Sequence, residues 1–328
     1  MSDSRRRVLA IARNEYRAAV RSRVLIALVG ILVLVTVVSV YVAAVEYASK
    51  LADYQAYVDA ASAGGIQRIA PSPLALLSLL RGVLEYLEII GAVLAIALGY
   101  LSVSRERANR TLSLIRSRPV TSGELAAGSV LGALGLICTL VTVTAAAAVL
   151  CLGLIGHDWV GGGQVVKLLL AYLASVFYLL AFYCLGALIT SRTRVASNGL
   201  VVALGLWLAV VLVLPQIGDT LDADNQVPGG LFAALTLDKP QEDRILADLG
   251  AYERLRTGIE AASFAKHYER FAFAMTDVKD KYRGKSLAQL LAIERNDMAW
   301  ISFYSLALGY GVFRSFGRQP PTPQEGES

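Results

Sequence analysis

The chain has 328 residues, of which 55% are hydrophobic and only 17% are charged. Soluble domains carry about a quarter charged residues, so one soluble core does not account for this composition, and the sequence predicts an all-α protein that crosses a membrane several times. The formal net charge of +5 does not indicate nucleic-acid binding, because the basic residues lie in separate loops and form no patch with interleaved aromatic residues.

Residues 1–23 predict an amphipathic helix on the cytoplasmic surface of the membrane. Arginines share one face at helical spacing and apolar side chains share another. The basic residues are Arg6, Arg13, Arg17 and Arg21, and the apolar ones are Val8, Leu9, Ala12, Tyr16, Ala19 and Val20. This pattern is typical of an interfacial helix in contact with lipid headgroups. Apolar residues become continuous only at Val24, which argues against an export signal.

Glu15 departs from this pattern because it lies at the edge of the apolar face. The residues three and four positions away from it supply no cation. Two interpretations remain open. Either Glu15 pairs with an arginine from another segment, such as Arg107, or the helix rolls and its carboxylate reaches water.

Six apolar runs predict six transmembrane helices. They cover about residues 24–45, 84–103, 129–155, 168–190, 197–216 and 298–313. The last run is the weakest, because Asp297 and Arg314 bound only 16 residues. The arginines gather in the loops on one side of these spans, so we expect both termini to lie in the cytoplasm and the protein to lie in the cell membrane. Residues 317–328 predict a disordered cytoplasmic tail.

Three ionisable residues, Arg81, Glu85 and Glu88, stand at the outer end of the second predicted span. Arg81 and Glu85 have the i,i+4 spacing of an ion pair on one helix face. Charged groups at membrane depth are candidates for a transport pathway, although a plain interfacial position explains them equally well.

The loop between the second and third spans, residues 104–124, carries five arginines and an apolar cluster that a solvated loop would not need. The cluster consists of Leu112, Leu114 and Ile115. Pro119 ends any helix formed before it, and Thr121 with Glu124 gives the capping box of the next helix. The loop therefore predicts a helix, a break and a second helix.

This loop follows a span that ends in Gly99-Tyr100. The order of its residues Glu106, Thr111, Leu112 and Pro119 resembles that in the permeases of type-2 ABC transporters. The nearest likeness is to the six-span branch associated with maturation of multicopper enzymes, including nitrous-oxide reductase. The resemblance implies that the loop is a coupling helix that binds a groove of a separate ATPase subunit. The expected contact residues are Glu106, Arg107, Thr111, Leu112, Leu114, Ile115 and Pro119.

Two observations limit that resemblance. Arg110 stands where the family commonly has glycine, which puts a close backbone approach at this position in doubt. A solvated, positively charged cytoplasmic loop is the alternative reading of the same residues.

Residues 218–297 form a long polar insertion before the last span. Helical patterns predict one helix from about Pro240 and a second over 264–278, and Ser286 with Gln289 predicts another capping box. We interpret the insertion as a small helical cap on the outer face, where Ser263 would be accessible to reagents. Its role in gating, partner docking or architecture stays open.

Motifs for chemistry are absent from the sequence, which contains no G-x-x-x-x-G-K-[ST], no H-E-x-x-H and no G-x-S-x-G. We therefore expect no enzyme, no cofactor and no metal site in this chain, with ATP and Mg²⁺ bound by the partner ATPase. The two histidines are His157 and His267, and the cysteines are Cys138, Cys151 and Cys184. The cysteines lie in predicted spans without C-x-x-C spacing, so they predict buried thiols rather than metal ligands.

Two functions remain compatible with the sequence. In the first, two permease subunits, identical or different, pair with two ATPases and translocate a substrate that the sequence does not identify. In the second, the membrane subunit does not transport, and the ATPase drives the outer insertion against an extracytoplasmic protein. Gly128, Gly132 and Gly135 share a helix face suited to close packing, either within the chain or across a dimer.

Overall fold

A computed structural model of the chain describes residues 3–64, 75–108, 121–155, 160–221, 231–248 and 250–316. Its first half contains α1 (Asp3–Val20), α2 (Arg23–Ala63), η1 (Leu76–Leu80), α3 (Arg81–Tyr86), η2 (Leu87–Gly91), α4 (Ala92–Ala108) and α6 (Ser122–Ile155). Its second half contains α7 (Gly162–Arg192), α8 (Ala196–Trp207), η3 (Leu208–Val213), α9 (Leu214–Thr220), α10 (Leu231–Ala234), α11 (Lys239–Asp248), α12 (Gly250–Ala262), α13 (Phe264–Met275), η5 (Asp280–Tyr282), α14 (Leu287–Ile293) and α15 (Arg295–Phe316).

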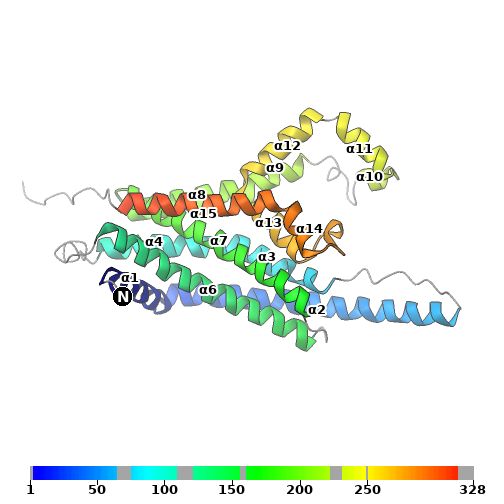
Figure 1. Ribbon diagram of the computed structural model, residues 1–328, viewed down its shortest axis with the longest axis horizontal. Coiled ribbons are helices and arrows are strands. Elements are labelled where there is room, and N and C mark those ends of the chain that lie inside the picture. The colour runs from blue at the N-terminus through cyan, green and yellow to red at the C-terminus, as the bar shows by residue number, and fades with distance from the viewer. Residues whose placement is uncertain are drawn as a thin grey trace, which may run out of the picture.

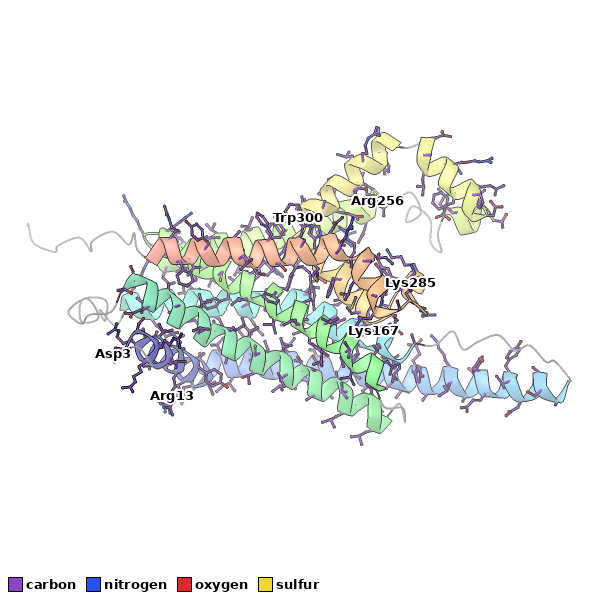
Figure 2. The ribbon with its side chains drawn as sticks, in the orientation of Figure 1. Asp3, Arg13, Lys167, Arg256, Lys285 and Trp300 are labelled. Carbon is purple, nitrogen blue, oxygen red and sulfur yellow. The ribbon has the colours of Figure 1, made fainter. Side chains whose placement is uncertain are left out.

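These elements form a bundle of long helices lying side by side (Figure 1). The helix α1 lies at one end of the bundle, whereas the tip of α2 and an arm made of α10, α11 and α12 extend from the other end (Figure 1). Asp3 and Arg13 mark the first end, and Lys167, Lys285 and Arg256 mark the second (Figure 2). The described residues contain no strand, and the prediction of an all-α membrane protein is confirmed.

Five helical stretches are long and apolar enough to cross a membrane, namely Leu25–Ala63, Leu76–Arg105, Ser122–Leu154, Gly162–Arg192 and Ala196–Thr220. They contain the first five predicted spans. The helix α15 is less apolar, because serine, tyrosine and glycine interrupt its hydrophobic residues. It runs parallel to α7, since Ser305 donates a hydrogen bond to the Phe177 carbonyl at 2.9 Å and Ser315 lies 3.1 Å from Ser191. Its membrane crossing stays a prediction.

The first span is longer than the sequence pattern predicted. A loop was expected from Glu46, but α2 continues as one helix of 41 residues to Ala63. At 1.5 Å per residue it is about 60 Å long, roughly twice the thickness of the hydrocarbon core. No glycine or proline interrupts residues 46–63, and Lys50 pairs with Glu46 one turn away at 2.6 Å, so nothing in this stretch ends the helix before Gly64.

The glycine face of α6 packs within the chain, against α1. A methyl group at Gly128 would lie 2.5 Å from the Cβ of Ile11, and one at Gly132 would lie 2.7 Å from the Cβ of Glu15. Of the two readings of these glycines, the structure therefore favours the intramolecular contact. Much of the apolar face of α1 therefore packs against other helices of the chain, although Leu9 and Val20 remain 53% and 46% exposed.

The insertion does not lie wholly over the outer face. The helix α13 packs between α7, α15 and η3 inside the bundle, and Ser263, at its N-cap, is completely buried. The expectation that Ser263 is accessible is therefore wrong. The physical reason is that the aromatic face of α13, with Phe264, Tyr268 and Phe271, packs against α7 and α15 rather than over the end of the bundle, which buries the N-cap as well. The capping box of α14 at Ser286 and Gln289 is confirmed.

Candidate coupling interface and outer charged groups

Four elements meet at the end of the bundle where α1 lies: α1 itself, the end of α4, the start of α6 and the turn between α7 and α8. The segment that joins α4 to α6, residues 109–120, lies outside the described residues. Five expected contact residues fall there, namely Thr111, Leu112, Leu114, Ile115 and Pro119. Glu106 belongs to α4, but its side chain is also outside the description. Their role in docking stays a prediction.

Arg107 joins the end of α4 to the end of α7 through two hydrogen bonds. Its Nη1 donates to the Thr193 carbonyl and its Nη2 to the Ser191 carbonyl, each at 2.8 Å. Carbonyls at a helix C-terminus lack partners within the helix and attract a cation. The interpretation of Arg107 as the partner of Glu15 is therefore wrong.

Glu15 faces Arg105 instead, with 3.7 Å between Oε2 and Nη2. Residues 105 and 107 are about 200° apart around a helix, so one side chain reaches α1 while the other reaches α7. The side chain of Glu15 is only 17% exposed. Burial raises the pKa of the Glu15 carboxyl, and the positive charge of Arg105 opposes part of that shift.

Glu124 makes two kinds of contact at the start of α6, a helix cap and an ion pair. The amide of Thr121 donates to its Oε2 at 2.9 Å, and its own amide donates to the Thr121 hydroxyl at 3.2 Å, which confirms the predicted capping box. Arg7 of α1 also donates to the carboxylate of Glu124, from Nη2 at 2.7 Å and from Nε at 3.2 Å. The capping pattern signalled Glu124, but no local pattern pointed to Arg7, which lies 117 positions earlier.

Arg81, Glu85 and Glu88 lie within the second span rather than at its end, because its helical part begins at Leu76. Arg81 and Glu85 form the predicted i,i+4 ion pair at 2.7 Å. Glu88 lies in η2 and is 9% exposed.

Ion pairs connect α13 to the fifth span. The ammonium group of Lys266 lies 3.1 Å from Asp219 of α9 and 2.9 Å from Glu269 of its own helix. At the start of α15, Asp297 lies 2.5 Å from Nδ1 of His267 and forms an ion pair with Arg270 of α13, whose Nε is 3.7 Å away. The insertion is thus joined by charges to both of the helices that flank it in sequence.

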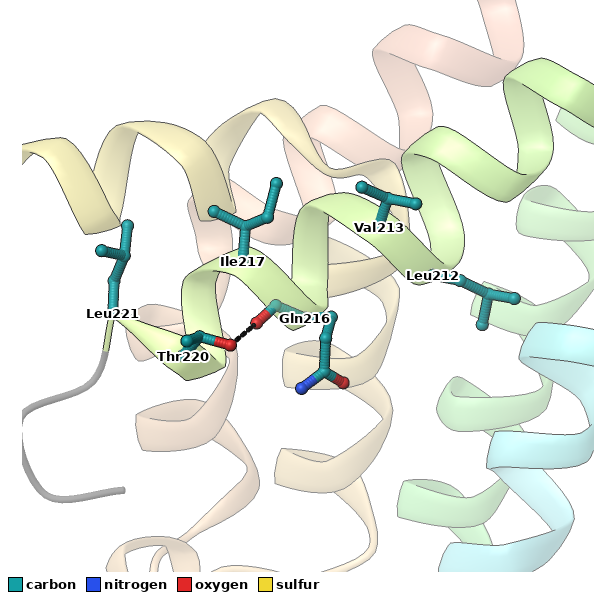
Figure 3. A pocket seen from close by; sticks show the side chains of 6 residues that line it. All are labelled: Leu212, Val213, Gln216, Ile217, Thr220 and Leu221. Carbon is teal, nitrogen blue, oxygen red and sulfur yellow. Dashed lines mark hydrogen bonds between the residues drawn. The ribbon is translucent and has the colours of Figure 1, made fainter. Parts of the chain in front are cut away.

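The end of the fifth span that includes α9 carries an open groove of about 490 Å³ (Figure 3). It is lined by Leu212, Val213, Gln216, Ile217, Thr220 and Leu221. The lining is mostly apolar, and its polar groups are partly engaged locally, since the Thr220 hydroxyl donates to the Gln216 carbonyl at 2.7 Å. None of the described residues that line the groove carries a charge.

The cysteines differ in environment. Cys184 is buried in α7, whereas Cys138 is exposed on α6 and Cys151 is half-buried. The prediction of buried thiols is wrong for Cys138, which lies on the face of α6 that points away from the bundle.

Comparison with protein families agrees with this architecture. Over residues 9–308 the sequence matches the family model described as ABC-2 family transporter protein. No curated protein matches the sequence. The family match covers α2 through most of α15, and thus all five spans that length and composition identify.

Proposed function

Because the chain belongs to the ABC-2 family of transporter proteins, we propose that this permease subunit couples ATP hydrolysis by a separate ATPase to translocation of a substrate across the cell membrane. ATP and Mg²⁺ are bound by the ATPase, and residues 104–124 form the contact with it. A second permease subunit, identical or different, completes the transporter.

The observation that carries this proposal is the attachment of both ends of the 109–120 segment. Before it, Arg107 holds α4 to the carbonyls of Ser191 and Thr193 at the end of α7. After it, Glu124 holds α6 to Arg7 of α1. A force applied to the segment therefore acts on α4 and α6 directly and is passed to two further helices, α7 and α1, through charge-assisted hydrogen bonds, which are the stronger kind.

The orientation follows from the distribution of arginines. The α1 end of the bundle carries the arginine-rich loops, so it faces the cytoplasm, together with both termini. The arm and the tip of α2 then project on the opposite side. The exposed arginines of α1, including Arg5, Arg6 and Arg13, face the headgroups of the inner leaflet.

A second function, in which the chain acts mechanically on an extracytoplasmic protein, has a specific observation in its favour. The bonds from Lys266 to Asp219 and from His267 to Asp297 fasten the insertion to the fifth and last membrane helices. Movement of those helices would be transferred to the arm. Transport and mechanical action share the same ATPase contact.

The contact is tested by purifying the tagged chain from its native membranes and identifying any ABC ATPase that accompanies it. Leu112→Asp with Ile115→Asp places charges where apolar contacts are proposed, and an unpaired charge in a protein groove costs several kcal/mol. We expect the ATPase to be lost. Leu235→Asp, at a 55% exposed position of the arm, is the matched control and should retain it. Retention of the ATPase by the double variant would exclude docking at this segment.

A further inference from the structure

Two membrane helices widen into π-helical turns next to the same buried helix. One is η2 (Leu87–Gly91) in the second span and the other is η3 (Leu208–Val213) in the fifth. Both segments pack against α13. Within α-helices, single π turns are rare and often mark functional sites. Two of them in contact with one buried helix therefore require a physical explanation.

Each π segment has a backbone carbonyl that accepts a hydrogen bond from a hydroxyl group. The Tyr178 hydroxyl of α7 donates to the Glu88 carbonyl at 3.1 Å, and the Ser263 hydroxyl donates to the Val210 carbonyl at 2.8 Å. In η3 the Leu214 amide donates to the Ala209 carbonyl, and the next residue, Pro215, has no N–H, so the π register leaves the Val210 carbonyl without a backbone donor. In an apolar setting such a carbonyl is costly unless another donor satisfies it. The hydroxyls of Tyr178 and Ser263 supply that donor.

A continuous chain of contacts joins the two hydroxyls. The rings of Tyr178 and Tyr268 stack with centroids 4.4 Å apart, and Phe264 lies 5.0 Å from Tyr178. The Tyr268 hydroxyl lies 2.8 Å from that of Ser175 on α7. Ser263 directly precedes Phe264 and also caps α13, because its hydroxyl accepts from the Lys266 amide at 3.3 Å. The position of α13 therefore determines whether the Ser263 donor reaches η3.

We propose that α13 is a wedge that holds the fifth span in its π register through Ser263, with Tyr178 holding the second span in the same way. Withdrawal of α13 removes the donor from the Val210 carbonyl. In the α register the Val210 carbonyl accepts from the Leu214 amide, and Pro215 leaves the Val211 carbonyl without a donor instead, so the Ser263 hydroxyl is what favours the π register over the α register. Ser263 and Tyr178 are positioning residues in this device.

Closing one π turn has a defined geometric result. The helix beyond it rotates by about 100° and advances by about 1.5 Å, because one residue joins the regular α repeat. The part of the fifth span that turns is α9, which carries the groove of Figure 3 and also Asp219. A change of register would therefore reorient the lining of that groove and break the Lys266–Asp219 pair together. That the change of register serves transport rests on the proposed function. The hydrogen bonds that hold the π register do not depend on the ATPase.

The register can be measured with spin-label distances in the full chain, reconstituted in lipid nanodiscs after Cys138, Cys151 and Cys184 are replaced by alanine. One label stays at Leu169, which is 64% exposed on α7. The second is placed beyond η3 at Gln216 or before η3 at Val201. With Ser263→Ala we expect a new Leu169–Gln216 distance population displaced by about 5–8 Å, given the rotation and the helix radius. The Leu169–Val201 distance should not change.

Two further variants separate the hydroxyl from the N-cap. Ser263→Gly is a tolerated cap that costs only a few tenths of a kcal/mol as such, but it lacks the donor, so it should behave like Ser263→Ala. Ser263→Thr keeps the donor and should match the wild type. Tyr178→Phe retains the ring and should displace a label at Leu79 of the second span. Unchanged Gln216 distances in both the Ala and the Gly variants, in a chain that still elutes as one folded species, would overturn the proposal. An altered distance in the variants, together with a wild-type chain that co-purifies with no ABC ATPase, would leave the wedge standing and contradict the proposed function instead.

Discussion

Glu15 of α1 and Arg105 of α4 face each other with 3.7 Å between their charged groups, while Arg107 turns to the other side of α4. Glu15→Arg should therefore place like charges together and lower the melting temperature. Arg105→Glu in the same chain should recover part of the loss, and Arg107→Glu should recover none. Because the pair is partly exposed, a double-mutant cycle should give a coupling energy of about 0.5 kcal/mol. Recovery of the melting temperature with Arg107→Glu but not with Arg105→Glu would show that Glu15 pairs with Arg107 and not with Arg105.

The burial of Glu15 predicts a dependence of stability on pH. The pKa of its carboxyl is raised in the folded chain, chiefly by burial, so the folded state holds this proton more tightly than the unfolded state. The stabilisation is complete below the unfolded pKa and is lost as pH rises through the folded pKa. Relative to Glu15→Gln, the wild type should therefore lose stability as the pH rises above about 4.5. A wild type that becomes the more stable of the two at pH 8 would show that Arg105 outweighs burial.

The contact of α6 with α1 predicts that replacing glycine by alanine destabilises the chain at one position of α6 and not at the next glycine. A methyl group at Gly132 would lie 2.8 Å from the Ala12 carbonyl oxygen and 2.7 Å from the Cβ of Glu15. Gly132→Ala should destabilise the chain by about 1–3 kcal/mol, as overpacking does. At Gly135 the nearest atom is 3.6 Å away, in the ring of Tyr16. Gly135→Ala is the control and should be neutral or stabilising, because alanine favours the helix. Equal effects in thermal unfolding would contradict the close packing of α1.

The arginine distribution predicts which positions an impermeant thiol reagent reaches in intact cells. In a chain whose native cysteines are replaced, a cysteine at Ser117 or Arg194 should stay unlabelled, because both lie at the end assigned to the cytoplasm. A cysteine at Leu255, which is 57% exposed on the arm, should be labelled. Permeabilised cells supply the control for reactivity. Labelling at Ser117 before permeabilisation would reverse the orientation.

The elements that depend on local patterns could be read from the sequence. Continuous apolar runs identified the five spans, and short S/T-x-x-E/Q motifs identified the caps at Thr121 and Ser286. The i,i+4 pair of Arg81 and Glu85 was equally local. In each case the interacting groups lie within about one helical turn, so spacing alone brings them together.

The contacts that were missed depend on how helices are placed against each other. The choice between Arg105 and Arg107 is set by which side of α4 meets α1. The pairing of Arg7 with Glu124 joins segments 117 positions apart. The burial of α13 was misjudged because a stripe of aromatic residues at helical spacing fits both a surface cap and a helix packed on several sides. The π segments leave no mark in the apolar pattern of their spans.

The central claim, that the segment between α4 and α6 touches an ATPase, is tested most directly by crosslinking in membranes. A photoreactive phenylalanine analogue at Ile115 should form an adduct with an ABC ATPase, identified by mass spectrometry, while the same analogue at Leu235 on the arm should form none. An adduct at Ile115 that disappears in the Leu112→Asp background would establish the contact through the apolar cluster. Efficient crosslinking of Ile115 to lipid alone, in a preparation where the ATPase hydrolyses ATP with this chain bound, would contradict it.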